Sequence, residues 1–403
     1  MGNVIVAQSG GPTVAINASL AGVIEGALAH HYDRIYGSIN GIQGIIEDNI
    51  LDISGLLDSN PNFLSVLKTS PAMYLGSCRY KLPNLDSNNQ VYSTLFSQFE
   101  KYNIDAFFYI GGNDSMDTVE KLSAYAKEIN SPIRFVGVPK TIDNDLCVTD
   151  HTPGFGSAAK YIATTTMEVI YDARIYKAKS VTIIEVMGRD AGWLTAATAL
   201  ARNEYCPGPD LIYLPETPFD KDEFIDSLKA ILENKNNVVV AVSEGIRDAK
   251  GQYISATSTA ADGFGHAQLS GAGKTLEYLV KERLGVKVRS IEVNVLQRAA
   301  AHLSSLTDLE ESVNVGKKAV EFAADGQTGI MTIMTRISNS PYEIEYSFAR
   351  IGEIANEAKP VPRQWINEKG DWVTEDMISY LRPLIMGEPK LNFDNGLPVY
   401  AMR

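Results

Sequence analysis

Short, continuously apolar runs alternate with segments of helical length along most of this chain. NVIVAQ, DAFFYI and IRFVGV occur before residue 140, and SVTIIEV and NNVVVAV occur after it; each is rich in β-branched or aromatic residues. Strands that are apolar on both faces are typical of parallel sheets covered by helices on both sides. Because the pattern occurs in both halves of the chain, we predict two Rossmann-like parallel-sheet α/β domains that bind ligands at the carboxyl ends of their strands.

The composition argues against several classes of protein. A chain of 403 residues is long enough for two domains. Its net charge of −13 argues against a nucleic-acid partner, although a local cluster of Arg and Lys can still bind an anionic substrate. The three cysteines form no CxxC pair and the five histidines have no metal-ligand spacing, which argues against a disulfide framework or a zinc site. Because we find neither a basic leader nor an apolar stretch of about 18 residues, we expect no membrane span and a cytoplasmic location.

Four Gly-rich turns follow predicted strands. They are QSGGPT (8–13), YIGGNDS (109–115), VMGRDAG (186–192) and VSEGIRD (242–248). Such turns place backbone N–H groups and helix N-termini where anions bind. One such turn would indicate only steric relief, but four together, with Arg189 and Arg247 among them, favour a phosphate-rich site.

Two further Gly-rich motifs do not fit a nucleotide site. SGAGKT (270–275) resembles a P-loop, but Gln268 stands where that motif needs its first glycine. GFGSAA (154–159) matches a dinucleotide fingerprint, yet it follows a polar loop instead of a strand. We expect neither to bind a nucleotide.

The stretch GVPKTIDND (137–145) is the strongest candidate for chemistry. Alternate loop residues point roughly the same way, so Thr141, Asp143 and Asp145 are expected to converge on one site. One carboxylate would accept a hydroxyl proton and another would hold Mg²⁺ directly or through water, while Lys140 would neutralise phosphate charge. A merely solvated turn fits poorly, because FVGV precedes this loop and TPGFGS follows it. The pattern predicts phosphoryl transfer.

The chain resembles the phosphofructokinases from about residue 3 to residue 335. SGGPTVAINA, LGSCRY, IGGNDS, PKTIDND, EVMGRDAGW, SEG and LQR occur in that family's order, and the tail VPRQWIN…PLIMGE looks like that of bacterial pyrophosphate-dependent members. The resemblance implies an active site in a cleft between two α/β domains. It also implies a homo-oligomer, a dimer or tetramer, whose subunits complete each other's sugar sites. We expect a donor-binding domain at 1–150, a sugar-phosphate-binding domain at 151–300, and a returning helix and strand with a C-terminal extension at 301–403.

The resemblance also implies a role for each matching residue. Asp143 would deprotonate the C1 hydroxyl of fructose 6-phosphate, Thr141 would position the sugar, and Arg79 would bridge the transferred phosphoryl group. Arg189 is expected to join these three and Asp145 in catalysis. The implied sugar-binding residues are Thr141, Asp143, Met187, Gly188, Arg189, Glu244, Arg289 and Arg298; those for the donor are Gly10, Gly11, Arg79, Asn113, Asp114, Ser115 and Lys140; those for Mg²⁺ are Asn113, Asp114 and Asp145.

The phosphoryl donor depends on two positions. ATP-using relatives commonly read GGDGS and PGTID, whereas this chain reads GGNDS and PKTID. Asp114 would repel a nucleotide's α-phosphate, and Lys140 would bind pyrophosphate while filling the room a nucleotide needs. We therefore expect reversible, pyrophosphate-dependent phosphorylation of fructose 6-phosphate at C1, giving fructose 1,6-bisphosphate and phosphate in glycolysis or gluconeogenesis.

Other functions remain as alternatives. They are an ATP-dependent phosphofructokinase, a pyrophosphate-dependent kinase that prefers sedoheptulose 7-phosphate, and a non-catalytic regulatory subunit. The last is disfavoured because a regulatory subunit is expected to lose its base, and Asp143 is present. Three departures from the family bear on metal and sugar contacts: Asn113 replaces an Asp, Ser180 replaces an Arg, and Val295 replaces a His.

Overall fold

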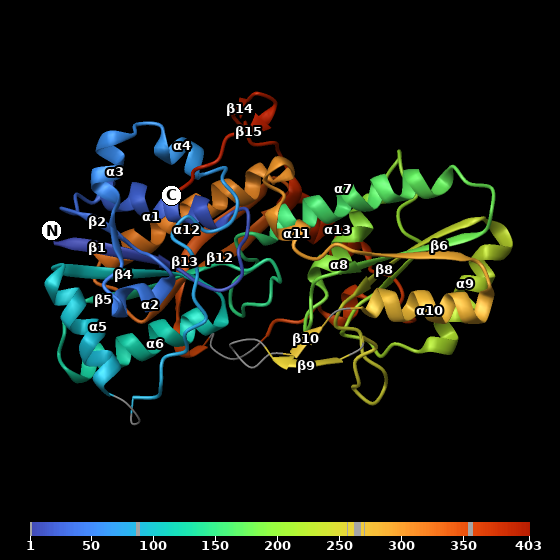
Figure 1. The fold of residues 1–403 in the computed structure, drawn as a ribbon, viewed down its shortest axis with the longest axis horizontal. Coiled ribbons are helices and arrows are strands. Elements are labelled where there is room, and N and C mark those ends of the chain that lie inside the picture. The colour runs from blue at the N-terminus through green and yellow to red at the C-terminus, as the bar shows by residue number, and fades with distance from the viewer. Residues whose placement is uncertain (1, 86–88, 256, 262–266, 270, 354–357) are drawn as a thin grey trace.

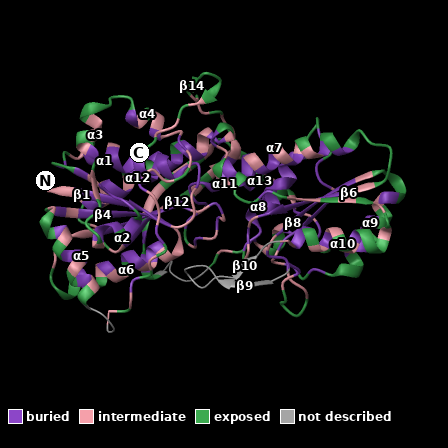
Figure 2. Cartoon of the chain, viewed as in Figure 1, coloured by how far each residue is buried: buried purple, intermediate pink, exposed green. Residues whose placement is uncertain are grey.

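The computed structural model describes residues 2–85, 89–255, 257–261, 267–269, 271–353 and 358–403. Two large sheets, each packed between helices, lie at opposite ends of an elongated molecule (Figure 1). Their central strands are almost entirely buried, whereas several strands at the edges are partly exposed (Figure 2). The expected two α/β units are therefore present. Among the described residues, no helix is both long enough and apolar enough to cross a membrane.

The first sheet has seven strands in the order β13-β12-β5-β4-β1-β2-β3. Its central strands are parallel, as the apolar runs predicted, whereas the edge strands β3 and β13 are antiparallel. β13 follows β12 through a short connection, and such connections join antiparallel strands. The strands are β1 (Asn3–Gln8), β2 (Ile35–Ser38), β3 (Ile50–Asp52), β4 (Ile104–Gly111), β5 (Arg134–Pro139), β12 (Ile330–Asn339) and β13 (Tyr342–Arg350).

Helices cover both faces of this sheet. α1 and α12 lie on one face, and α5 and α6 lie on the other (Figure 1). α1 and α12 approach closely because of Gly22, where an added Cβ would lie 2.0 Å from the carbonyl oxygen of Val313. The helices of this region are α1 (Ile16–Ala29), α2 (Gly41–Ile46), α3 (Ile53–Ser59), α4 (Phe63–Leu67), α5 (Asn89–Lys101), α6 (Asn113–Glu128) and α12 (Leu306–Ala324).

The second sheet has four parallel strands in the order β11-β6-β8-β7. α7 and α8 pack on one face, and α9 and α10 pack on the other (Figure 1). The elements are β6 (Ser180–Val186), β7 (Leu211–Tyr213), β8 (Asn237–Ser243), β11 (Lys287–Glu292), α7 (Phe155–Arg174), α8 (Trp193–Ala197), α9 (Lys221–Asn234), α10 (Ala272–Leu284) and α11 (Leu296–Ala299). A small hairpin of β9 (Thr257–Ala261) and β10 (Ala267–Leu269) precedes α10.

The last part of the chain belongs to both units. α12, β12 and β13 complete the first unit, whereas residues 361–384 pack against the core of the second. The tail, defined as residues 358–403, contains α13 (Glu375–Leu381). Near its end it forms a hairpin of β14 (Phe393–Asp394) and β15 (Leu397–Pro398). The chain thus crosses between the units several times, and the boundaries at 150 and 300 stay a prediction.

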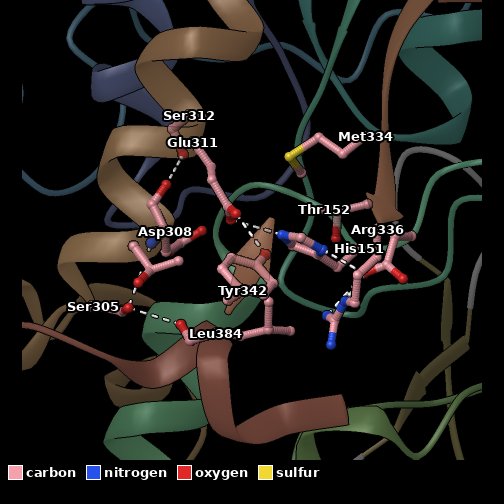
Figure 3. A network of polar contacts seen from close by, with 12 residues as sticks. His151, Thr152, Ser305, Asp308, Glu311, Ser312, Met334, Arg336, Tyr342 and Leu384 are labelled. Atoms are coloured by element: carbon pink, nitrogen blue, oxygen red, sulfur yellow. Dashed lines mark hydrogen bonds and ion pairs between the residues drawn. The ribbon is translucent and has the colours of Figure 1, made fainter. Parts of the chain in front are cut away.

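A buried polar network joins the units behind the loop that follows β5 (Figure 3). His151 lies between two carboxylates, with Nδ1 2.7 Å from Asp150 Oδ1 and Nε2 2.7 Å from Glu311 Oε2. Glu311, on α12, also accepts a hydrogen bond from the Tyr342 hydroxyl at 2.6 Å. Arg336 of β12 donates to Asp150 at 2.9 Å. The network ties the loop to α12 and to the β12–β13 hairpin.

Candidate active site

The carboxyl ends of β1, β4 and β5 in the first unit, and of β6 and β8 in the second, border one cavity of about 520 Å³. All the residues predicted to form the site line this cavity, except Gly188 and Arg289. Polar groups from chain segments far apart in sequence therefore converge in one place. The roles assigned to these residues are not decided by their position alone and stay predictions.

The loop after β5 carries the two carboxylates. Lys140 N donates to Gly111 O at 3.0 Å, which holds the start of the loop against the end of β4. The Thr141 hydroxyl accepts a hydrogen bond from Asp143 N at 3.1 Å and so shapes the turn. Asn144 has a left-handed backbone with φ of 54°. Asp143 and Asp145, on either side of it, both line the cavity.

Charge is concentrated around these carboxylates. Burial raises the pKa of Asp143, while Lys140, Arg189 and Arg298 oppose that rise. Burial and the neighbouring Asp143 raise the pKa of Asp145 to about 7. A buried carboxylate beside cations, with its pKa raised above the ordinary value, is suited to accept a proton.

The side of the cavity that is predicted to bind the donor is formed by the turn after β1 and the start of α6. Lys140 Nζ donates to Gly11 O at 2.7 Å, and an added Cβ on Gly10 would lie 3.3 Å from that ammonium. A Cβ on Gly11 would lie 3.1 Å from Arg298 Nη1. A Cβ at either position would be tight against a cation, and Gly10 also has a left-handed backbone with φ of 78° that favours glycine. Burial lowers the pKa of Lys140 to about 8.

The first turn of α6 supplies further groups. Asn113, Asp114 and Ser115 lie in that turn and line the cavity. Backbone N–H groups at a helix N-terminus attract phosphate oxygens. The Asp114 carboxylate at the same place disfavours additional phosphates, as in a nucleotide. This end of the cavity therefore combines a helix N-terminus, which favours anions, with a carboxylate, which would disfavour additional negative charge.

The cavity residues fit a divalent cation that arrives with a phosphate ligand. Oδ1 of Asn113 is buried and has no hydrogen-bond partner among the described residues. Asp145 and Asp114 line the same cavity. Within the described parts of the chain, no group of three His, Cys, Asp or Glu residues is arranged to hold a metal alone. Mg²⁺ commonly uses one or two carboxylates together with substrate phosphates, so the set suits that mode of binding.

The side of the cavity that is predicted to bind the sugar is formed by the second unit. Met187, Arg189 and Glu244 line the cavity. Gly188 lies behind Glu244, and its N–H donates to Glu244 Oε1 at 3.3 Å. Burial raises the pKa of Glu244 to about 7. Arg298 is half-buried, and its Nε has no hydrogen-bond partner in the described structure. These groups leave donors and acceptors available for a polar ligand.

Arg289 is not brought into the cavity of its own chain. It lies on the edge strand β11, exposed, with Nη1 3.4 Å from Asp172 Oδ2. Alternate side chains of an edge strand point to solvent. The sequence alone does not show whether Arg289 lies at such a position or in the cleft. Two of the departures also lie outside the cavity lining: Ser180 accepts a hydrogen bond from Asn237 at 3.0 Å, and Val295 is exposed.

Each of the two Gly-rich motifs that we expected not to bind a nucleotide lies at a helix N-terminus, where a carboxylate of this chain accepts hydrogen bonds from its backbone N–H groups. Glu185 of β6 accepts hydrogen bonds from the N–H groups of Gly271 and Gly273, at 3.2 and 2.6 Å, where α10 begins. Asp308 of α12 does the same at the start of α7, accepting from Gly154 at 2.8 Å and Ser157 at 3.0 Å (Figure 3). A side-chain carboxylate therefore already takes the place that a bound anion would have at each of these two helix N-termini.

Two residues that contact the loop after β5 were not predicted from the sequence. Lys359 and Tyr380, from the tail, contact residues 144–150 and do not line the cavity. The tail is irregular and carries no motif, so its composition gave no signal of this contact. Only the folded chain brings the two segments together.

Comparisons of the sequence and of the structure with known proteins agree on one family. The family model described as phosphofructokinase matches residues 3–323. The chain is 42% identical to the pyrophosphate–fructose 6-phosphate 1-phosphotransferase of Halomonas elongata and 41% identical to that of Methylococcus capsulatus. Each match covers 99% of this chain and 95% of the relative. The pyrophosphate-dependent phosphofructokinase structures from Nitrosospira multiformis and Marinobacter aquaeolei both match with a TM-score of 0.88 and 38% identity, over 99% of this chain and 95% of theirs.

Proposed function

This chain belongs to the phosphofructokinase family, and we propose on that basis a specific reaction for its cleft. It is an enzyme that transfers a phosphoryl group from pyrophosphate to the C1 hydroxyl of fructose 6-phosphate, giving fructose 1,6-bisphosphate and phosphate. The observation that carries the choice of donor is the contact of Lys140 Nζ with Gly11 O, inside the cavity that also holds Asp143. Pyrophosphate and a sugar phosphate ester are close in energy, so we expect the reaction to be reversible.

At the sugar, Asp143 acts as the base that takes the proton from the C1 hydroxyl. Lys140 and Arg189 provide positive charge beside Asp143 and keep its carboxylate available. Glu244 accepts hydrogen bonds from sugar hydroxyls, and Arg298 binds phosphate. The Thr141 hydroxyl, already bonded to Asp143 N, helps to position the sugar.

At the donor, the protein positions the phosphates and neutralises their charge. Backbone N–H groups of Gly10 and Gly11 would face the phosphate oxygens with Ser115 beside them, Lys140 would offset their charge, and Arg79 would bridge the transferred group. Mg²⁺, held by Asn113, Asp114 and Asp145 with the donor oxygens, would supply further positive charge. The catalytic gain comes mainly from alignment and charge stabilisation, since phosphoryl transfer requires little covalent participation by the protein.

The sugar site is completed by a second subunit in this proposal. Arg289 is exposed on its own subunit, so it would reach a neighbour's 6-phosphate in a dimer or tetramer. We place the enzyme in the cytoplasm, where its substrates are metabolites. A regulatory, non-catalytic role fits less well for two reasons. The relatives that match nearly the whole chain carry the names of enzymes, and Asp143, the proposed base, is retained in this chain.

The reaction is tested by identifying its products in both directions. With Mg²⁺, pyrophosphate and fructose 6-phosphate, phosphorus NMR should show one new ester at C1 and release of phosphate. Fructose 1,6-bisphosphate with phosphate should regenerate pyrophosphate. Absence of both conversions in well-folded protein, together with turnover of sedoheptulose 7-phosphate, would assign a different sugar.

A further inference from the structure

Asn144 lies between the two cavity carboxylates and is held by its side chain. The residue is fully buried and has a left-handed backbone, which turns the chain so that Asp143 and Asp145 both line the cavity. Its Nδ2 donates to the Tyr380 hydroxyl at 2.9 Å, and its Oδ1 accepts from Lys359 Nζ at 3.4 Å. Both ends of this amide are therefore bound by the tail.

Lys359 contacts the same loop at several points. Its Nζ donates to Asp150 O at 2.7 Å and to Thr149 O at 3.0 Å, while its own N–H donates to Asp145 O at 2.8 Å. The Tyr380 hydroxyl donates to Asp150 O at 2.7 Å. One lysine and one tyrosine thus satisfy buried acceptors at both ends of residues 144–150, where an unpaired carbonyl would be costly.

The same tail segment also contacts the loop that carries Arg189. Lys359 O accepts a hydrogen bond from Trp193 Nε1 at 2.8 Å. Glu216 Oε1 accepts from both Gly192 N at 2.8 Å and Val361 N at 2.9 Å. Residues 359–361 therefore lie between the base-bearing loop of the first unit and the arginine-bearing loop of the second.

We propose that Lys359, with Asn144 and Tyr380, forms a clamp that positions the two carboxylates for phosphoryl transfer. Lys359 and Tyr380 lie beyond the region matched by the family model, which ends at residue 323. They do not line the cavity, so the clamp acts through the loop and not on the substrate. This inference rests on the proposed function, because it assigns the clamp to the base and metal ligands of that reaction.

The main test replaces Lys359 with methionine, which keeps its length and removes its donors. A displaced loop misaligns the base, so kcat should fall about tenfold or more, while KM for fructose 6-phosphate should change less than about threefold. Lys359→Arg should restore part of kcat. The matched control is Lys369→Met, an exposed lysine in the same tail that pairs with Asp371 and should leave kcat unchanged.

Hydrogen–deuterium exchange separates positioning from general stability. Peptides covering 141–150 should exchange about tenfold faster in Lys359→Met than in the parent or Lys369→Met, while peptides from β1 and β4 keep their protection. If Lys359→Met fails to fold, Tyr380→Phe serves as the second variant, because it loses only a hydroxyl. Unchanged exchange, or kcat within twofold of the parent in folded protein, overturns the clamp.

The assay of the parent keeps the two proposals apart. If the parent shows no pyrophosphate-dependent turnover, the proposed function fails, and exchange of 141–150 still decides whether the clamp holds the loop. If the parent is active and Lys359→Met retains full kcat, the clamp fails and the proposed function stands.

Discussion

Lys140 Nζ donates a hydrogen bond to Gly11 O at 2.7 Å, so the residue that follows β5 closes onto the Gly-rich turn that follows β1. This contact places a buried ammonium in the part of the cavity where the donor phosphates are proposed to bind. The Lys140 side chain would supply positive charge that suits pyrophosphate, and its volume would leave less room for a larger donor such as a nucleotide. In the proposed function, selection of the donor therefore depends on Lys140 together with Asp114, which lines the same cavity.

The donor preference is tested by separating charge from bulk. Lys140→Met keeps most of the volume and removes the charge, so kcat/KM for pyrophosphate should fall roughly 10- to 100-fold with no gain in ATP use. The double variant Asp114→Gly/Lys140→Gly removes both the repulsion and the bulk, and ATP turnover should rise about tenfold or more. Steady-state kinetics with each donor measures both. A double variant that gains no ATP activity would contradict the steric account.

Asp143 is predicted to be the base. Asp143→Ser should lower kcat by about 10² or more with little change in KM, because the variant binds substrate but cannot accept the proton. Initial rates at saturating fructose 6-phosphate give the comparison. Survival of kcat would remove Asp143 from this role. Asp226→Ser, outside the cavity on the exposed face of α9, is the control for the substitution itself.

The buried His151 predicts a dependence of stability on pH. Burial disfavours its charged form, but Glu311 and Asp150 outweigh that effect and raise its pKa from 6.5 to about 9. Because the folded state holds this proton more tightly than the unfolded state, the stabilisation is complete below pH 6.5 and is lost as pH rises toward 9. The full loss is about 3 kcal/mol.

Urea denaturation at pH 6.5 and pH 9 measures this loss. His151→Gln should show a much smaller difference between the two pH values than the parent. His302→Gln, which changes an exposed histidine, should keep the parent's difference. An equal difference in His151→Gln and in the parent would show that other groups cause the dependence.

Arg289 provides a test of the proposed oligomer. Arg289→Ala should raise KM for fructose 6-phosphate about tenfold while KM for pyrophosphate stays within about twofold, because one phosphate contact is lost. Arg283→Ala removes another exposed arginine, paired with Asp222, and should change neither. At fructose 6-phosphate concentrations well below KM, co-purified hybrids of Arg289→Ala and Asp143→Ser subunits should be more active than either variant alone. Hybrids without such recovery would place Arg289 outside the sugar site.

Much of this architecture was predictable because local sequence determines it. Apolar runs predicted the central parallel strands, and the Gly-rich turns predicted where polar groups gather, since strand ends in a parallel sheet share one edge. The features that the sequence did not reveal depend on long-range packing. The antiparallel edges arise from where the returning chain pairs, the exposure of Arg289 depends on β11 being an edge strand, and the contact of Lys359 with Asn144 requires the tail to fold back.

The most direct measurement of the central claim is a donor comparison on the parent enzyme. Formation of fructose 1,6-bisphosphate from fructose 6-phosphate is followed at saturating Mg²⁺ with either pyrophosphate or ATP. Rapid turnover with pyrophosphate and at least about 100-fold less with ATP is the predicted result. Turnover with ATP that equals or exceeds turnover with pyrophosphate would contradict the assignment of donor choice to Lys140 and Asp114.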